Sequence, residues 1–271
     1  MKNVLFTTAD TKNFPYAVMM LRSLTKFHTS PQLDIILYTT EKDKTKLAQL
    51  PKGVTVEDLT PYLDDPMFFY RQKPVLAEPL LKDYDLVIGA DCDQIICGDL
   101  SYIFDTTDYD VAGVLNYNAM DAQTYGLVQG WGIHPVEYWN CGLVAMRSKK
   151  FVHDWLVWCF SPQFDRLQYK EQDGLNALVY HGNWNARNLD HGDGLANMRA
   201  WWGLFAKSYW NQAIMKDGRV IIPKLEGDQI RNEDTEIKVF HFAGGANAKK
   251  MNYYTYVNDD VATYLDSLIT A

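Results

Sequence analysis

The sequence lacks any long hydrophobic run: nowhere do roughly 18 apolar residues follow one another, the length that a membrane-spanning helix requires. Near the start, the apolar residues 4–6 are followed at once by Thr7 and Thr8, which is too short a run for the core of a signal peptide. The chain has only 4 cysteines in 271 residues, and their spacing matches no paired zinc-binding pattern. These absences predict a reduced, cytoplasmic protein with no transmembrane segment.

Several common catalytic motifs are missing as well. No phosphate-binding loop of the form G-x-x-x-x-G-K-[ST] occurs, and no G-x-G-x-x-G follows the first predicted strand. The motifs H-E-x-x-H and G-x-S-x-G are also absent. P-loop kinases and ATPases, dinucleotide-dependent oxidoreductases, common zinc proteases and serine hydrolases are therefore disfavoured.

Acidic residues outnumber basic ones, 34 to 26, which gives a formal net charge of -8 at pH 7. An acidic chain is a poor partner for nucleic acid or an anionic membrane, so neither is expected. Hydrophobic residues make up 47% and charged residues 22%, the composition of a globular protein. At this length we expect one α/β domain that covers residues 1–271.

Short apolar runs alternate with helical patterns at the start of the chain. Strands are predicted at residues 2–8, 33–38 and 54–59, and helices at residues 14–28 and 41–50. This order predicts a mixed, mostly parallel sheet with helices on its faces. Further strands are predicted at residues 86–90, 110–116, 142–146, 220–222 and 237–242, and further helices at residues 148–160, 170–180 and 259–269.

Asp91-Cys92-Asp93 directly follows the strongest predicted strand, residues 86–90. Ligands of α/β proteins bind at the carboxyl ends of strands, and two carboxylates one residue apart suit Mg²⁺ or Mn²⁺. A bare D-x-D is more often a solvated loop or a helix cap, but the preceding strand favours a metal site here.

Three further segments place candidate site residues at the ends of predicted strands or helices. His241 ends a late strand and is a good ligand for Mn²⁺, or else a hydrogen-bonded core histidine. Asn140 precedes a strand and offers both donor and acceptor to sugar hydroxyls, or serves as a turn residue. Glu171 and Gln172 open a helix, where the helix dipole alone would explain an acidic residue.

In order and spacing, the segments TTAD, IGADCD, YWNCGLVAM, EQDGLNAL and HFAGG resemble the family 8 glycosyltransferases, which include glycogenin and bacterial lipopolysaccharide glucosyl- and galactosyltransferases. The resemblance runs from residue 4 to about residue 250. It implies the GT-A fold, a UDP-sugar donor, retention of configuration, and Mn²⁺ as cofactor, with Mg²⁺ as a possible substitute.

The resemblance also implies roles for individual residues. The metal ligands would be Asp91, Asp93 and His241. The donor would be bound by Thr7, Thr8, Asp10, Lys73 (with Arg71 as a rival), Cys92, Asn116, Gly244 and Lys249 (with Lys250 as a rival). Asn140 would lie beneath the donor sugar, and Gln172 near the anomeric carbon beside Glu171; these three are the candidate catalytic residues.

The chain departs from the family pattern at several positions. Asn116 stands where the family usually has aspartate, and Lys249 comes two positions late in the closing motif, with no Pro-Trp after it. The stacking tyrosine of the family corresponds to Phe14 or Tyr16.

The expected reaction moves a hexose, glucose or galactose, from a UDP-sugar to a hydroxyl of a carbohydrate or glycoprotein acceptor. Front-face attack is favoured, with the leaving phosphate taking the acceptor's proton. Residues 1–115 would form the nucleotide-binding half, and residues 116–271 the acceptor-binding half with a C-terminal helix. The alternatives are a catalytically weak or inactive sugar-binding homologue, a sugar nucleotidyltransferase, and an inverting transferase with Asp190 or Asp193 as base.

All 8 tryptophans lie between Trp131 and Trp210. Trp155 and Trp158 fall in a predicted helix and are expected to pack in the core. The other tryptophans considered, in irregular sequence, would either pack likewise or form a stacking platform for an acceptor sugar: Trp131, Trp184, Trp201 and Trp202.

Overall fold

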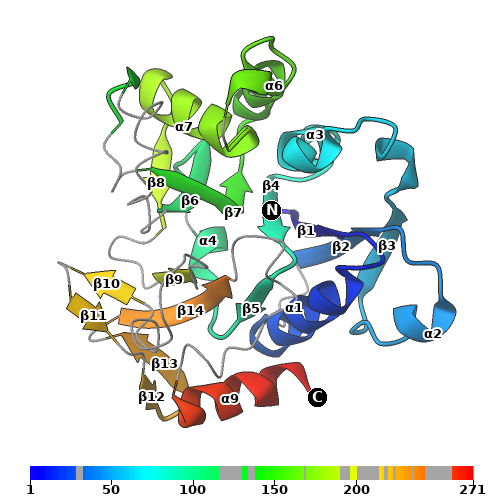
Figure 1. Cartoon of the computed structure of the whole chain (residues 1–271), viewed down its shortest axis with the longest axis vertical. Helices are drawn as coiled ribbons and strands as arrows, with labels where there is room; N and C mark the ends of the chain where they lie inside the picture. The colour runs from blue at the N-terminus through cyan, green and yellow to red at the C-terminus, as the bar shows by residue number, and fades with distance from the viewer. Residues whose placement is uncertain are drawn as a thin grey trace.

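The computed structural model describes residues 1–28, 33–105, 107–115, 130–133, 138–167, 169–189, 196–199, 214–216, 219–221, 224–232, 235–241 and 258–270. In this part of the chain a central β-sheet lies between helices, and a second sheet packs beside it (Figure 1). The predicted α/β class with a mixed, mostly parallel central sheet is confirmed.

Seven strands form the central sheet among the described residues: β1 (Asn3–Ala9), β2 (Leu33–Thr39), β3 (Val54–Asp58), β4 (Leu86–Asp91), β6 (Val111–Leu115), β7 (Trp139–Met146) and β8 (Ala186–Asn188). In space they follow the order β3-β2-β1-β4-β7-β6-β8. The first four strands of this order are parallel neighbours, whereas β7 runs antiparallel to both β4 and β6. Thr8 is paired in register with Asp91, so the carboxyl ends of β1 and β4 lie side by side.

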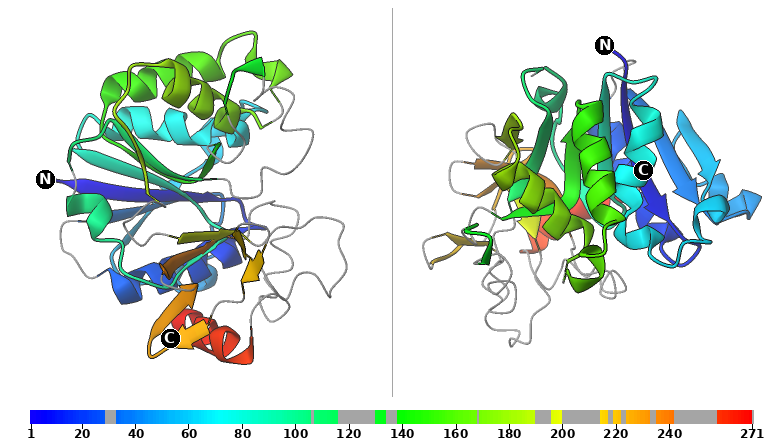
Figure 2. Two further views of the ribbon diagram at one scale, coloured as in Figure 1. Left: turned by 90° about the vertical axis from the view of Figure 1, so that its left-hand side faces the viewer. Right: turned by 90° about the horizontal axis from the view of Figure 1, so that it is seen from above.

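Helices cover both faces of this sheet. Helix α1 (Phe14–Phe27) lies on one face, and α3 (Gln72–Leu80), α6 (Lys149–Cys159) and α7 (Glu171–His181) lie on the other (Figure 2). Strand β1 is buried along its whole length, and successive side chains point to opposite faces. Leu5 shares a core cluster with Leu21 of α1, whereas Phe6 shares one with Trp155 of α6. Burial on both faces explains the unbroken apolar run of this strand.

The smaller sheet joins distant parts of the chain. Its described strands are β5 (Gln94–Ile96), β9 (Ala196–Arg199), β12 (Lys224–Glu226), β13 (Gln229–Asn232) and β14 (Thr235–His241). Helix α9 (Asp259–Ile269) packs against it through Val261 and Leu265 (Figure 1). Strand β14 pairs antiparallel with β5, which aligns His241 with Gln94. Only Cys92 and Asp93 separate β4 from β5, so the Asp-Cys-Asp motif is the junction between the two sheets.

Most predicted elements are present with small shifts at their ends, and the helix at residues 259–269 has the predicted bounds. The helix predicted at residues 41–50 is only α2 (Lys44–Leu47), which buries none of its residues. Helix α3 was not predicted, because Pro74 and Pro79 interrupt its pattern and its apolar residues are spread around it. The described residues also include the short elements α4 (Tyr102–Asp105), β10 (Ile214–Lys216) and β11 (Arg219–Ile221). Among the described residues, no helix has the length and hydrophobicity needed to cross a membrane.

Candidate active site

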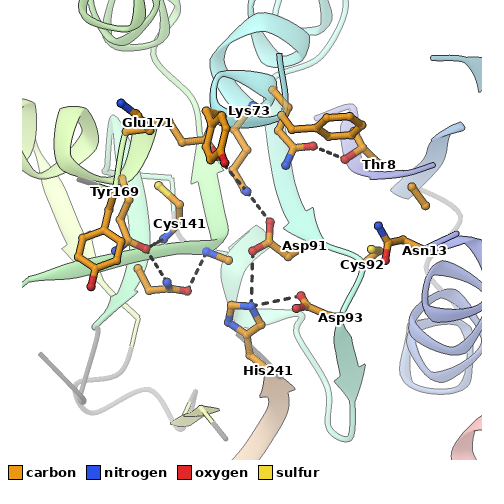
Figure 3. Close-up of a pocket in the computed structure, with 18 of the residues that line it drawn as sticks. Thr8, Asn13, Lys73, Asp91, Cys92, Asp93, Cys141, Tyr169, Glu171 and His241 are labelled. Atoms are coloured by element: carbon orange, nitrogen blue, oxygen red, sulfur yellow. Dashed lines mark hydrogen bonds and ion pairs between the residues drawn. The ribbon is translucent and has the colours of Figure 1, made fainter. Parts of the chain in front are cut away.

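A pocket lies at the carboxyl ends of β1 and β4, where the two sheets meet (Figure 3). Its volume of about 430 Å³ is in the range of small-molecule sites. Both halves of the chain contribute polar lining residues: Thr8, Asp10, Lys73, Asp91, Cys92 and Asp93 from the first half, and Asn140, Glu171, Gln172 and His241 from the second. The structure therefore brings together most of the residues that the sequence singled out.

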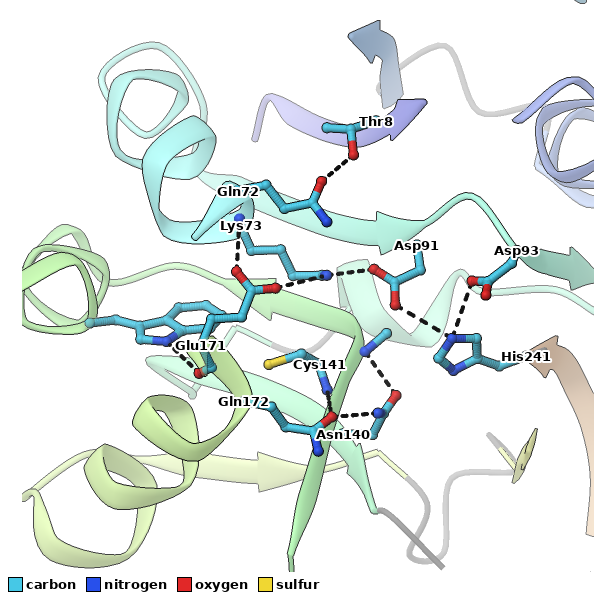
Figure 4. A network of polar contacts seen from close by, with 12 residues as sticks. Thr8, Gln72, Lys73, Asp91, Asp93, Asn140, Cys141, Glu171, Gln172 and His241 are labelled. Carbon is cyan, nitrogen blue, oxygen red and sulfur yellow. Dashed lines mark hydrogen bonds and ion pairs between the residues drawn. The ribbon is translucent and has the colours of Figure 1, made fainter. Parts of the chain in front are cut away.

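Asp91, Asp93 and His241 form a cluster that could hold a metal ion. One ligand atom from each residue can be chosen so that all three lie within 4.8 Å of one another. The Nε2 atom of His241 lies 3.4 Å from Asp91 Oδ2 and 3.4 Å from Asp93 Oδ1 (Figure 4). The cluster exists because β14 pairs with β5, which places the end of β14 beside the junction after β4.

The imidazole of His241 is 1% exposed, and neither ring nitrogen makes a hydrogen bond of good geometry within the described structure. Burial lowers the pKa of His241, but the hydrogen-bonding and charge of Asp91 and Asp93 outweigh it and raise the pKa above 6.5. A divalent cation between the three residues would replace the two 3.4 Å contacts of Nε2 with direct coordination by the imidazole and the carboxylates. Two carboxylates and an imidazole suit Mn²⁺, and the residues present fit the predicted metal.

Lys73 connects the metal cluster to α7. Its ammonium is 2.5 Å from Asp91 Oδ1 and 3.4 Å from Glu171 Oε1, and its side chain is 3% exposed (Figure 4). Burial lowers the pKa of Lys73, but the two carboxylates outweigh it and raise the pKa, so the ammonium stays charged. Burial raises the pKa of Asp91, but Lys73 and His241 together hold it well below its usual range. Burial raises the pKa of Glu171, and Lys73 opposes this only in part.

Arg71, the rival of Lys73, lies elsewhere. Its guanidinium pairs with Asp65 at 3.1 Å and lies over the rings of Phe160 and Phe164, at 4.6 and 4.8 Å from their centroids. It does not belong to the pocket lining. Of the two candidates for a contact with the donor phosphate, Lys73 thus lines the pocket, whereas Arg71 packs against aromatic side chains.

Gln172 and Asn140 form a second polar connection, between α7 and the start of β7. Gln172 Oε1 accepts hydrogen bonds from Asn140 Nδ2 at 2.6 Å and from the backbone N–H of Cys141 at 3.1 Å. Asn140 Oδ1 in turn accepts from the N–H of Gly142 at 2.8 Å. Both side chains are therefore fixed in orientation at the floor of the pocket (Figure 4).

The turn before α7 has an unusual backbone. Lys170 has φ 49° and ψ −116°, and it is the one non-glycine residue with positive φ among the described residues. The N–H of Gln172 donates to the carbonyl of Tyr169 at 2.9 Å, which closes a four-residue turn of type II′. Glycine normally occupies this position, and a side chain there costs about 1–3 kcal/mol. Such strain tends to occur at functional sites.

The other end of the pocket is formed by the residues that follow β1. Thr8 donates to Gln72 Oε1, and Asp10 accepts from the N–H of Asn13 at 2.7 Å. Thr7 is fully buried and does not line the pocket, so this predicted donor-binding residue is not brought to the others.

The two candidates for the stacking aromatic residue differ in exposure. Phe14 is 2% exposed and belongs to the core, whereas Tyr16 is partly exposed. Burial, with smaller effects from nearby Cys92 and Asp93, raises the pKa of Tyr16. Tyr16 is therefore the accessible one, next to the Asp-Cys-Asp motif.

The described tryptophans serve packing. Trp155 is fully buried, and its indole N–H donates to the carbonyl of Glu171 at 2.9 Å. Trp131 packs edge-on against Trp158 at 6.1 Å, and Trp184 packs against Phe151 at 5.3 Å. None of these residues lines the pocket, and for Trp131 and Trp184 these contacts favour the packing alternative; an acceptor platform at these two residues stays a prediction.

No protein-family model matches the chain, and no curated protein matches its sequence. Solved structures do match. The galactosyltransferase LgtC, in complex with donor and acceptor sugar analogues, gives a TM-score of 0.60 at 16% identity and covers 99% of this chain and 97% of its own. Mouse xyloside xylosyltransferase 1 gives a TM-score of 0.60 at 12% identity, with 90% and 99% covered. The bifunctional glycosyltransferase WbbM gives 0.65 at 13% identity, with 99% of this chain but 50% of WbbM covered.

The chain has the GT-A glycosyltransferase fold. The expectation drawn from the five short motifs is confirmed at the level of the fold, over nearly the whole chain. The pocket occupies the place where open α/β sheets bind ligands, at the carboxyl ends of parallel strands.

Within this GT-A fold, several candidate residues lie outside the described residues. They are Asn116, Asp190, Asp193, Trp201, Trp202, Gly244, Lys249 and Lys250. Their proposed roles stay predictions.

Other residues that line the pocket were not predicted from the sequence. Phe69, Tyr70, Tyr169 and Lys170 also line the pocket, and Phe69 and Tyr70 are 42% and 53% exposed; Tyr169 is seen in Figure 3. Single aromatic residues in a loop carry no periodic signal. Gln72 could have been noticed only together with Lys73, on a helix that the pattern did not predict.

Proposed function

We propose that this protein is a retaining, Mn²⁺-dependent glycosyltransferase that moves a hexose from a UDP-sugar to a hydroxyl group of a carbohydrate or glycoprotein. The observation that carries the proposal is the buried cluster of Asp91, Asp93 and His241 at the junction of the two sheets. The Nε2 atom of His241 lies 3.4 Å from a carboxylate oxygen of each aspartate, so the three candidate ligand atoms surround one point that a cation could occupy. The GT-A fold and the resemblance of the motifs to family 8 support the same reaction.

A bound Mn²⁺ would act as a Lewis acid and neutralise the charge that develops on the departing diphosphate. Asp91, Asp93 and His241 would hold it. Lys73, buried and charged beside Asp91, would supply a second fixed positive charge for the donor phosphates. Thr8 and Asp10, which line the pocket, would bind the uridine, and Tyr16, which does not line it but lies near Cys92 and Asp93, would be the stacking residue.

The division of the chain into two halves fits this arrangement. Residues 1–115 supply the uridine end and both aspartates, and residues 116–271 supply Asn140, Glu171, Gln172 and His241. We propose one GT-A domain whose halves bind nucleotide and acceptor respectively. The aromatic side chains of Phe69, Tyr70 and Tyr169, which line the pocket, offer faces on which an acceptor sugar could stack.

The hydrogen bonds of α7 support front-face attack over a covalent intermediate. Gln172 Oε1 already accepts two hydrogen bonds, and an amide oxygen is a weak nucleophile. The Glu171 carboxylate is 3.4 Å from the Lys73 ammonium, which lowers its nucleophilicity. We therefore infer that the acceptor hydroxyl attacks from the side of the leaving group and passes its proton to the departing phosphate oxygen. Gln172 and Asn140 would hold the sugar during this step.

A panel of UDP-sugars tests the proposal. We expect one or two of them to be hydrolysed slowly in the presence of Mn²⁺ and not in excess EDTA. Asp91→Ala should abolish this hydrolysis, whereas Asp64→Ala, which removes an exposed aspartate outside the pocket, should not change it. Undiminished hydrolysis in Asp91→Ala would contradict the assignment of Asp91 as a metal ligand.

Two alternatives predict different outcomes. A sugar-binding homologue without activity would bind UDP in a Mn²⁺-dependent way, seen by tryptophan fluorescence, and hydrolyse no donor. A sugar nucleotidyltransferase would release pyrophosphate from UTP and a sugar 1-phosphate. The anomeric configuration of the product, read by NMR, separates a retaining from an inverting transferase.

A further inference from the structure

The strained turn from Tyr169 to Gln172 carries two polar residues that line the pocket, Glu171 and Gln172. Glu171 contacts Lys73 through its carboxylate, and Gln172 contacts Asn140. Glu171 and Gln172 are the two residues that follow Lys170, whose positive φ of 49° sets the direction of the backbone that carries them. A change of this φ toward an ordinary negative value would turn Glu171 and Gln172 away from their partners.

Two anchors hold the turn against that change. Asp173 is 1% exposed and accepts the N–H of Tyr169 at 2.7 Å and the hydroxyl of Tyr138 at 2.6 Å. The ammonium of Lys170 donates to the carbonyl of Asp165 at 2.9 Å and to that of Phe164 at 3.4 Å.

The carbonyls that Lys170 binds belong to a short 3-10 helix, Phe164–Arg166, which comes just before the turn. The aliphatic part of Lys170 thus spans the loop between this short helix and α7, and its ammonium also lies 5.7 Å from the centre of the Phe164 ring. A glycine at position 170 would adopt the same φ without strain but would lack this tether.

From these contacts we infer that Lys170 is a positioning residue: its side chain ties the strained turn to residues 164 and 165 and thereby fixes Glu171 and Gln172 at the reaction centre. This inference rests on the proposed glycosyl transfer for its kinetic consequence. Its structural consequence does not depend on that reaction.

Trp155 provides a readout that needs no activity. Its indole N–H donates to the carbonyl of Glu171, the residue directly after Lys170. The ¹H–¹⁵N signal of this indole, assigned by loss of the peak in Trp155→Phe, reports where the turn lies. We expect it to shift in Lys170→Ala and to stay in place in Lys170→Arg and in Lys52→Ala, which removes an exposed lysine elsewhere.

The kinetic test uses three substitutions of the same residue. In Lys170→Ala, turnover should fall about tenfold or more, while the Kd for UDP with Mn²⁺ changes less than about threefold, because positioning is lost and nucleotide contacts remain. Lys170→Arg should recover most of the turnover, since a guanidinium can donate to both carbonyls. Lys170→Gly should lie between the alanine and arginine variants, because glycine removes the strain that the tether opposes.

The outcomes separate the inference from the proposed function. An unshifted Trp155 signal in Lys170→Ala overturns the inference, whatever the activity. Equal turnover in the wild type and Lys170→Ala, or equal losses in the alanine and glycine variants, also overturns it. A wild-type protein that turns over no UDP-sugar contradicts the proposed function alone, and the Trp155 signal then still decides whether Lys170 holds the turn.

Discussion

Gly142 leaves the space that the ring of His241 occupies. A Cβ atom on Gly142 would lie 2.1 Å from Cε1 and 2.5 Å from Nδ1 of His241. Both distances are far below van der Waals contact, and the imidazole is buried, so it could not move aside at low cost. The strand that begins with Trp139 therefore contributes to the metal cluster without supplying a ligand.

Gly142→Ala should consequently weaken the binding of Mn²⁺ by about 10- to 100-fold, the usual effect of disturbing a residue that orients a metal ligand. Calorimetry or Mn²⁺ electron paramagnetic resonance measures this directly. Gly130→Ala is the matched control, because a Cβ there would meet nothing within 4 Å. Equal Mn²⁺ affinity in both variants would mean that His241 is no ligand or that the strand yields easily.

The raised pKa of His241 gives the Mn²⁺ response a pH dependence. Burial alone lowers that pKa, but Asp91 and Asp93 raise it above 6.5 in the folded protein. Without metal, the stability from charged His241 is fully present below pH 6.5 and is lost as the pH rises through the raised pKa. Mn²⁺ requires the neutral ring, so the rise in Tm that it causes should grow as the pH rises through the same window.

Thermal unfolding with Mn²⁺ and with EDTA, across a series of pH values, measures this difference in Tm. His153→Asn is the control for histidine in general, because His153 is an exposed residue of α6 with a 62% exposed side chain. It should keep the pH dependence, and His241→Asn should lose it. A Mn²⁺ effect that does not change with pH would contradict the assignment of His241 as a ligand.

Lys73 and Glu171 should depend on each other for stability. Removing Lys73 leaves the buried Glu171 carboxylate without its cation and takes a partner from Asp91, so Lys73→Met is expected to cost about 3–5 kcal/mol in the free energy of unfolding. Glu171→Gln in the Lys73→Met background should cost less than in the wild type. A double-mutant cycle by denaturant unfolding should give a coupling energy of about 1–3 kcal/mol.

The pair formed by Lys150 and Asp154 is the matched comparison. Their charged atoms are 2.7 Å apart, but the side chains are 74% and 34% exposed. Water screens such a pair, so its cycle should give a clearly smaller coupling. Equal coupling in the two cycles would show that burial does not strengthen the contact of Lys73 with Glu171.

The sequence predicted what depends on local pattern. The strand ending at Asp91 is an unbroken apolar run between charged residues, and α9 has four residues on one face that the structure buries. Asp91, Asp93 and His241 could be grouped only through a family resemblance, because 148 positions separate Asp93 from His241 and nothing local links them. In the structure the link is the pairing of β5 with β14.

Other features depend on tertiary contacts and left no local signal. Lys73 lies on a helix that contains two prolines, and its buried position follows from the two carboxylates that it meets. The positive φ of Lys170 could not be predicted, because lysine gives no sign of a position that usually requires glycine. For Trp131 and Trp184 the irregular local sequence left packing and sugar stacking equally open, and only the tertiary structure shows that both contact residues of α6.

Gln172 should matter for transfer more than for nucleotide binding. Gln172 is the second residue of α7, and its side chain is held by Asn140 and the backbone of Cys141, whereas the proposal assigns the uridine to Thr8 and Asp10. Gln172→Ala is therefore expected to leave the Kd for UDP with Mn²⁺ nearly unchanged and to lower turnover by about 100-fold, because the sugar loses its fixed contact.

Fluorescence titration with UDP and a transfer assay under single-turnover conditions measure the two quantities separately. Gln163→Ala, which changes an exposed glutamine outside the pocket, should alter neither. A collapse of UDP binding in Gln172→Ala, with Gln163→Ala normal, would place Gln172 at the nucleotide. An unchanged turnover in Gln172→Ala would show that Gln172 does not act at the reaction centre. Glu171, which also lines the pocket and pairs with Lys73, would then be the remaining candidate on α7.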